Sequence, residues 1–247
     1  MRTKLSIWTL LALIAVASAG CAKLQARDNL NKGVRAFREG KYDSAIKFFE
    51  ESIRLDPELT NAELYLATAY AQQYIPGAQS PDNQQKADKA IEIFGRVLQR
   101  DSNNLSAIKG LASMYQNKGD LRKAREYYIR NSEIDPMDAV PFYAIASLNY
   151  LILQVKTAPP TPEEAAQLIE EGLQNVDKAL ALNPDYEDAM FNKNLLYREK
   201  ARLTSSEAEK EQLTKTANEI FDKAMEIRKR NQEKNRGPGG IVLDEKK

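Results

Sequence analysis

The 247-residue sequence predicts an all-α fold, a solenoid of about five helix pairs closed by a capping C-terminal helix. Two observations carry this prediction. Small and apolar residues recur at fixed spacings between residues 26 and 231, and repeats on this scale build stacked helical arrays. The composition, with 43% apolar and 29% charged residues, is sufficient for a packed core and argues against a disordered chain.

The first 20 residues predict an export signal. Arg2 and Lys4 precede an apolar stretch from Leu5 to Val16, and a run of small residues then ends at Gly20. This order is typical of a secretory signal peptide, and the apolar stretch is shorter than the ~20 residues of a membrane-spanning helix. Removal of residues 1–20 takes away two of the 36 basic residues and none of the 35 acidic ones, so the net charge changes from +1 to −1.

The end of this signal resembles the lipobox of bacterial lipoproteins. Ser18-Ala19-Gly20 places small residues directly before Cys21, although the family usually has Leu where this chain has Ser18. The resemblance implies a lipid on Cys21, with residues 21–25 as the lipidated N-terminus and a short linker. Because Ala22 follows rather than Asp, it also implies attachment to the outer membrane, facing the periplasm.

A second interpretation of the same residues stays open. Ala17-Ser18-Ala19 fits an ordinary cleavage site, and cutting after Ala19 would release a soluble periplasmic protein. The position of the single cysteine favours the lipoprotein, because a lone exported thiol has no partner and is prone to oxidation.

The recurrence in the rest of the chain has a measurable period. One set of five positions repeats after 79 residues, a second set after 45 and a third after 34. Since 79 is the sum of the other two spacings, the basic unit has 34 residues and one copy carries an 11-residue insertion. The matching positions are Gly40, Tyr42, Ala45, Phe49 and Pro57 with Gly119, Leu121, Ala124, Tyr128 and Pro136; Leu66, Ala67 and Tyr70 with Leu111, Ala112 and Tyr115; and Ala90 and Phe94 with Ala124 and Tyr128.

These residues resemble the tetratricopeptide repeat, a helix–turn–helix of 34 residues. The resemblance implies a right-handed solenoid in which Ala45, Ala90 and Ala124 lie where helices approach closely. The aromatic residues Phe49, Phe94 and Tyr128 are expected to fill the gap between neighbouring repeats.

The repeats divide the chain into regions. We expect a solenoid over 26–231, with repeats at about 26–57, 60–102, 105–136, 139–184 and 187–231, and a mobile tail over 232–247. The predicted helix pairs are 26–39 with 42–55, 60–74 with 82–100, 105–118 with 121–134, 139–154 with 162–182, and 187–203 with 206–231.

Helix starts are marked by capping residues. Ser80, Thr161 and Ser206 each precede a helix, and Thr60 with Glu63 has the spacing of a capping box. The turns at 72–85, 155–161 and 204–216 are longer than the repeat requires, so they decorate one edge of the solenoid. That edge is either extra core or a second contact surface formed by Tyr74, Ile75, Pro76, Val155, Pro159 and Pro160.

The composition excludes several kinds of chemistry. With no histidine and one cysteine, the chain lacks Ser-His-Asp and Cys-His catalysis and histidine metal sites. No nucleotide or calcium motif is present, and the near-neutral charge gives no reason to bind nucleic acid. We therefore expect no enzyme, cofactor or small-molecule substrate. A carboxylate-based hydrolase of envelope polymers, using acidic pairs such as Glu170-Glu171, is a distant alternative.

Tetratricopeptide solenoids bind partners along the concave surface of the first helix in each pair. The resemblance implies that the partner is an envelope or periplasmic protein or peptide, while the oligomeric state stays open. The Lys-and-Asn clamp of chaperone-binding members is absent, because Leu30 and Val34 occupy its positions. The predicted groove combines aromatic and polar side chains, with Val140 and Leu151 beside them: Phe37, Arg38, Lys109, Gln116, Tyr143, Tyr150, Phe191 and Arg198.

Overall fold

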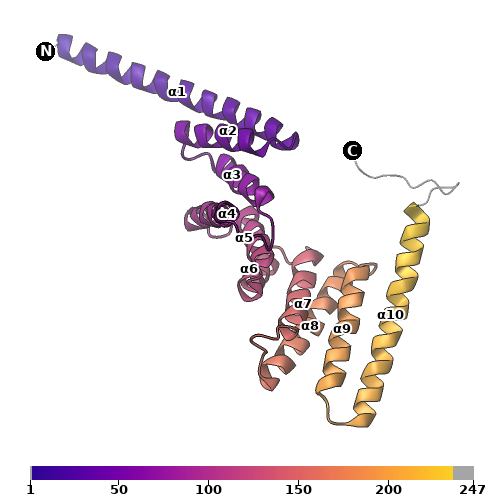
Figure 1. Ribbon diagram of the computed structural model, residues 1–247. Helices are drawn as coiled ribbons and strands as arrows, with labels where there is room; N and C mark the ends of the chain where they lie inside the picture. Colours follow the sequence, from indigo (N-terminus) through magenta and orange to yellow (C-terminus); the bar gives the residue numbers. More distant parts are fainter. Residues whose placement is uncertain (1, 236–247) are drawn as a thin grey trace. The chain divides into compact units, whose positions relative to one another are not determined.

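The computed structural model describes the backbone of residues 2–235 and the side chains of residues 20–233, and regular structure in this part of the chain consists of ten helices (Figure 1). The chain divides into two compact units, Met1–Gly119 and Asp120–Lys247. The helices are α1 Arg2–Arg38, α2 Tyr42–Leu55, α3 Thr60–Gln73, α4 Pro81–Arg100, α5 Leu105–Lys118, α6 Leu121–Ile134, α7 Ala139–Leu153, α8 Pro162–Leu182, α9 Glu187–Leu203 and α10 Glu207–Asn235.

The predicted helix pairs are confirmed to within one or two residues over the middle of the chain, and two boundaries differ. Helix α1 continues without a break through residues 21–25, where a short linker was expected, so the first repeat helix is extended toward the N-terminus. Helix α10 runs to Asn235 rather than 231, so the start of the expected tail is helical. The remainder of that tail, 236–247, lies outside the described residues.

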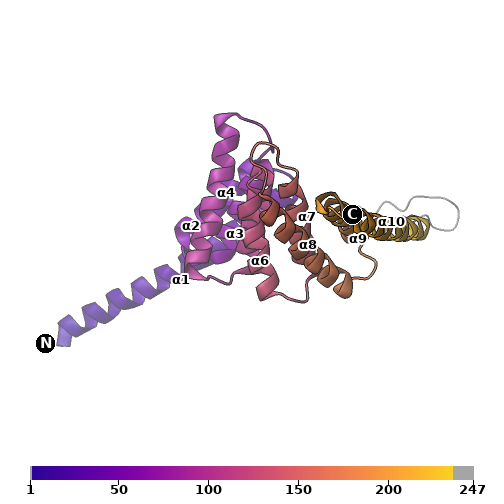
Figure 2. The same ribbon diagram turned by 90° about the horizontal axis from the view of Figure 1, so that it is seen from below.

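The first unit stacks α1 to α5 so that each helix packs against the next. Helix α3 also contacts α1 on one side and α5 on the other, so the odd-numbered helices form one layer and α2 and α4 the other. The close pairs α1–α2 and α3–α4 lie side by side in Figure 1 and again in Figure 2. This is the helix-pair arrangement that the repeats predict.

The small repeat residues occupy the positions expected of them. Ala45, Ala90 and Ala124 are fully buried, as expected of small residues at close contacts between helices. Phe49 stacks on Tyr65 of the following repeat with 5.6 Å between ring centroids, so it does fill the gap between repeats. The same ring lies directly against the backbone of Gly33 in α1, where a Cβ atom would come within 2.6 Å of its δ carbon.

Turn residues recur with the repeats. Gly40 and Gly119 have φ angles of 72° and 80°, a conformation that glycine adopts without steric cost, and both follow the first helix of a pair. The second helix of a pair ends on Asp or Asn whose backbone N–H donates to the carbonyl four residues earlier. These C-caps are Asp56, Asp101, Asp135 and Asn183.

Three of the four predicted caps are confirmed. Ser80, Thr161 and Ser206 each accept a hydrogen bond from the backbone N–H three residues later. The expectation for Thr60 is wrong, because Leu59 is the N-cap and no side-chain cap bond forms. Glu63 is instead buried and forms an ion pair with Arg100 of α4, so its carboxylate serves helix packing rather than capping.

The second unit stacks α6 to α10 in the same way, with α7 also contacting α9. Its core includes Phe142, Leu173 and Leu196, from three successive helices. Asn149 is fully buried on α7, where it donates to the carbonyl of Leu168 at 2.9 Å and accepts from Arg125 Nε at 2.7 Å. This buried amide therefore joins α6, α7 and α8 by hydrogen bonds with specific geometry.

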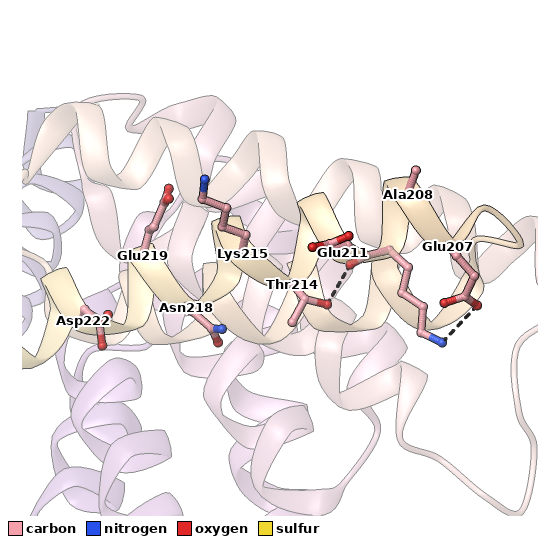
Figure 3. A pocket seen from close by; sticks show the side chains of 9 residues that line it. Glu207, Ala208, Glu211, Thr214, Lys215, Asn218, Glu219 and Asp222 are labelled. Carbon is pink, nitrogen blue, oxygen red and sulfur yellow. Dashed lines mark hydrogen bonds and ion pairs between the residues drawn. The ribbon is translucent and has the colours of Figure 1, made fainter.

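The last helix, α10, packs against α9 through Ala217, Ala224 and Ile227. Part of its surface that does not face α9 is polar, and Figure 3 shows Glu207, Glu211, Lys215 and Glu219 along it. A charged outer side is what a terminal capping helix requires for solubility.

Candidate functional site

The predicted groove residues fall on the odd-numbered helices of both units, as the resemblance implies. The first unit carries Phe37, Arg38, Lys109 and Gln116, on α1 and α5, and the second carries Tyr143, Tyr150, Phe191 and Arg198, on α7 and α9. Their surroundings differ strongly, and these differences decide which of them are accessible to a partner.

Phe37 is half-buried between three helices. Its ring makes edge-to-face contacts with Tyr42 of α2, at 5.3 Å between centroids, and with Tyr65 of α3, at 6.3 Å. This aromatic cluster stabilises the first repeat, so only part of Phe37 is accessible. Arg38, the last residue of α1, is exposed.

Lys109 and Gln116 are both exposed on α5, seven residues apart and therefore on one face of the helix. Each already interacts with other residues of the chain. They accordingly contribute polar groups to this face of α5.

Tyr143 and Tyr150 are half-buried and pack against the core of the second unit. The ring centroids of Tyr143 and Tyr186 are 4.9 Å apart, and Tyr186 directly precedes α9. Burial, together with the carboxylate of Asp188, raises the pKa of the Tyr143 hydroxyl, and the hydrogen bond with Ser147 opposes that rise. Burial and neighbouring groups raise the pKa of Tyr186 to about 12. Both rings thus contribute to packing, which limits the area that they offer a partner.

The two most exposed large side chains of α7 are apolar. Val140 is 52% exposed and Leu151 is 39% exposed, with half-buried Ala144 and Ser147 between them on the same side of the helix. We call these four residues the α7 strip. Apolar side chains that share one side of a helix mark a contact surface more readily than isolated ones do.

Phe191 and Arg198 lie where α9 borders α10. The ring of Phe191 makes an edge-to-face contact with Phe221 at 5.7 Å, and the guanidinium of Arg228 lies 4.4 Å from its centroid. Arg198 Nε donates to Asn194 Oδ1 at 3.2 Å, and an Nη group donates to Asn218 Oδ1 of α10 at 2.8 Å. Both residues were expected to line a surface of first helices alone, yet their partners on α10 make this a two-helix surface.

The sequence did not indicate several residues that shape these surfaces. Tyr186 lies in a turn, and Asn194, Asn218 and Phe221 each occupy a helix without a distinctive pattern. The seven-residue spacing between Phe191 and Arg198 places them on one face, but only the structure shows which neighbour that face meets.

The acidic pairs do not converge on a common point. Glu170 forms an ion pair with Lys200 of α9, while Glu171 pairs with Arg125 of α6, so adjacent carboxylates face different helices. Among the described residues there is no group of three or more His, Cys, Asp or Glu side chains that could hold a metal ion. Within that same part of the chain, no helix has both the length and the apolar character needed to cross a membrane.

Comparison with known proteins supports the fold. The sequence model of the tetratricopeptide repeat matches residues 26–59, and a second model of the same repeat matches residues 110–136. A search of the curated proteins gave no match.

Solved structures of the same architecture cover most of the chain. MamA residues 41 to the end, from Desulfovibrio magneticus RS-1, align with a TM-score of 0.62 and 18% identity, covering 83% of this chain and 96% of that chain. YrrB, described as a TPR protein with an unusual peptide-binding site, aligns with a TM-score of 0.56 and 14% identity, covering 83% and 90%. At these identities the likeness establishes a tetratricopeptide-type solenoid.

Proposed function

We propose that this tetratricopeptide-type solenoid is a non-catalytic scaffold that holds a peptide or partner protein on the α7 strip. The observation that carries this proposal is the pair of exposed aliphatic side chains, Val140 and Leu151, on one side of α7, with half-buried Ala144 and Ser147 between them. A surface of this kind suits an extended peptide or the apolar face of a partner helix. The peptide-binding site named in the description of YrrB supports the same kind of ligand.

We further propose that the scaffold is exported and anchored by a lipid on Cys21, at the outer membrane and facing the periplasm. Cys21 is exposed on α1, and the buried residues of that helix begin at Ala26 among the described side chains. A lipid on Cys21 therefore lies outside the packed part of the repeat. Each buried CH₂ group contributes about 0.8 kcal/mol to membrane attachment, and stable attachment requires more than one chain.

Fractionation tests the anchor. The native protein is expected in the membrane fraction, and Cys21→Ser is expected to move it to the soluble fraction because the attachment atom is lost. Mass measurement of the mature N-terminus is the second readout. An unmodified N-terminus at Gly20 would contradict lipidation and identify the soluble periplasmic form instead.

Quantitative pulldown from envelope extract of the source organism tests the α7 strip. Val140→Gln combined with Leu151→Gln is expected to weaken capture of the main partner at least about tenfold, since losing buried anchors at an interface typically costs 1–2 kcal/mol or more. Met137→Gln is the matched control, because Met137 is 76% exposed and precedes α7. Undiminished capture by the double variant would place the contact elsewhere.

A further inference from the structure

Arg198 differs in its bonding partners from five other arginines of the second unit. Arg122, Arg125, Arg202, Arg228 and Arg230 each form an ion pair with a carboxylate. The hydrogen bonds of Arg198 go to two neutral amides, those of Asn194 and Asn218, and no carboxylate of the described residues forms an ion pair with it. Its positive charge is therefore held in place without being neutralised.

The amides fix the guanidinium in one orientation. Asn194 is only 4% exposed, and its amide nitrogen donates to the backbone carbonyl of Ala217 in α10, which leaves its oxygen aimed at Arg198. The Arg198 side chain is exposed but bridges two helices. An oriented, solvent-accessible guanidinium binds a carboxylate with little further loss of side-chain entropy, and its planar fork matches two carboxylate oxygens.

Apolar side chains lie about two helical turns from this cation. Phe191 is on the same face of α9, seven residues and therefore about 10.5 Å from Arg198 along the helix axis. Phe221 is 40% exposed and Met225 44% exposed on the adjoining part of α10. An extended peptide advances about 3.3 Å per residue, so a carboxylate and an apolar side chain about three residues apart would span the two features.

We propose that Arg198 anchors a carboxylate-binding site on the α9–α10 surface, and that the partner segment docking there carries a single acidic residue about three positions from an aromatic or aliphatic one. This inference rests on the proposed scaffold function and specifies the chemistry of its partner. A single carboxylate fits better than a polyacidic run because Asp222 lies one turn from Asn218 on α10 and repels further negative charge (Figure 3).

Selection from a phage library of random dodecapeptides against the full chain tests the site. Enriched peptides are expected to contain one Asp or Glu at the stated spacing from an apolar residue. A synthetic peptide of that sequence is expected to bind Arg198→Gln about tenfold to hundredfold more weakly, the usual effect of losing a charged hydrogen-bond partner. Arg202→Gln is the matched control, because Arg202 is exposed on the same helix and pairs with Glu199.

A charge reversal separates recognition from a structural role. Selection against Arg198→Glu is expected to enrich basic peptides, a change that loss of helix packing alone would not produce. Thermal melting accompanies each variant, and Arg198→Lys, which keeps the charge, should retain the acidic preference if Arg198→Gln folds poorly.

Four results would overturn the proposal: no enriched peptide, enrichment without an acidic preference, equal affinity for Arg198→Gln, or an equal loss with Arg202→Gln. If the enriched peptides lack the acidic residue and their binding depends on Val140 and Leu151, the scaffold function would stand and the Arg198 site would be rejected.

Discussion

Two helical glycines of the first unit provide a matched test of how closely the repeats pack. Gly110 in α5 lies against Phe94 of α4, and a Cβ atom at this position would come within 2.6 Å of both ε carbons of the ring. A Cβ atom added at Gly95 in α4 would have no neighbouring atom within 4 Å. Replacing either residue with Ala changes the helix propensity equally, so any difference between the two variants reports on the contact with Phe94.

The expected changes in folding stability follow from these surroundings. Ala in place of Gly in a helix interior is worth about 1 kcal/mol, so Gly95→Ala is expected to raise the stability by that amount. Gly110→Ala gains the same propensity but overpacks a site whose ring is only 3% exposed, at a cost of about 1–3 kcal/mol. The two variants should therefore differ by about 1–3 kcal/mol, and by about 2–12 °C in Tm for a chain of this size.

Thermal and urea unfolding, followed by circular dichroism, measure this difference. The double variant Gly110→Ala with Phe94→Leu tests whether the ring causes the loss. Removing the ring should relieve the clash, so the two substitutions should show a coupling energy of at least about 1 kcal/mol. A Gly110→Ala protein as stable as Gly95→Ala would refute the reasoning, since it would show that the ring moves aside without cost.

Three further predictions follow from packing and burial. Ala124→Leu is expected to lower the stability by about 1–3 kcal/mol through overpacking at a fully buried position, and unchanged unfolding would mean that α6 can shift to accept it. Tyr143→Ala combined with Tyr150→Ala is expected to lower Tm because both rings pack on the core, and an unchanged Tm would show that their packing does not contribute to stability. Tyr186 should titrate near pH 12, measured by tyrosinate absorbance and assigned by Tyr186→Phe. Because its folded pKa lies above the unfolded value of about 10, the stability that its burial provides is present below pH 10 and is lost as the pH rises toward 12; a titration near 10 would contradict this.

The sequence predicted the helix pairs closely because their signals are local. Ala45 and Ala124, 79 residues apart, are both fully buried on second helices, and glycines follow first helices where the chain needs a positive φ. Thr60 and Glu63 also matched a local pattern, yet the buried carboxylate pairs with Arg100, which lies on another helix. A spacing rule does not distinguish a cap from a contact with a residue far along the chain.

The candidate site was less predictable for the same reason. The helical spacing predicted the face of α7 that carries Tyr143, but whether its ring is free or packed against another ring depends on Tyr186, 43 residues later. The charge of Arg198 is evident from the sequence, whereas its two neutral hydrogen-bond partners, one on α9 and one on α10, depend on the register between these helices.

The polar outer side of α10 decides where the array stops. Identical helix pairs can in principle add without limit, because each new pair covers the apolar side of the one before and exposes its own. With Glu211 and Glu219 on its outer side, α10 ends this series, so the length of the array is set by the side chains of one helix rather than by the number of repeats. A chain truncated after Leu203 would expose Met190, which α10 otherwise covers. A second molecule could then pack on this exposed surface, and repeated head-to-tail association of this kind would form an open-ended assembly.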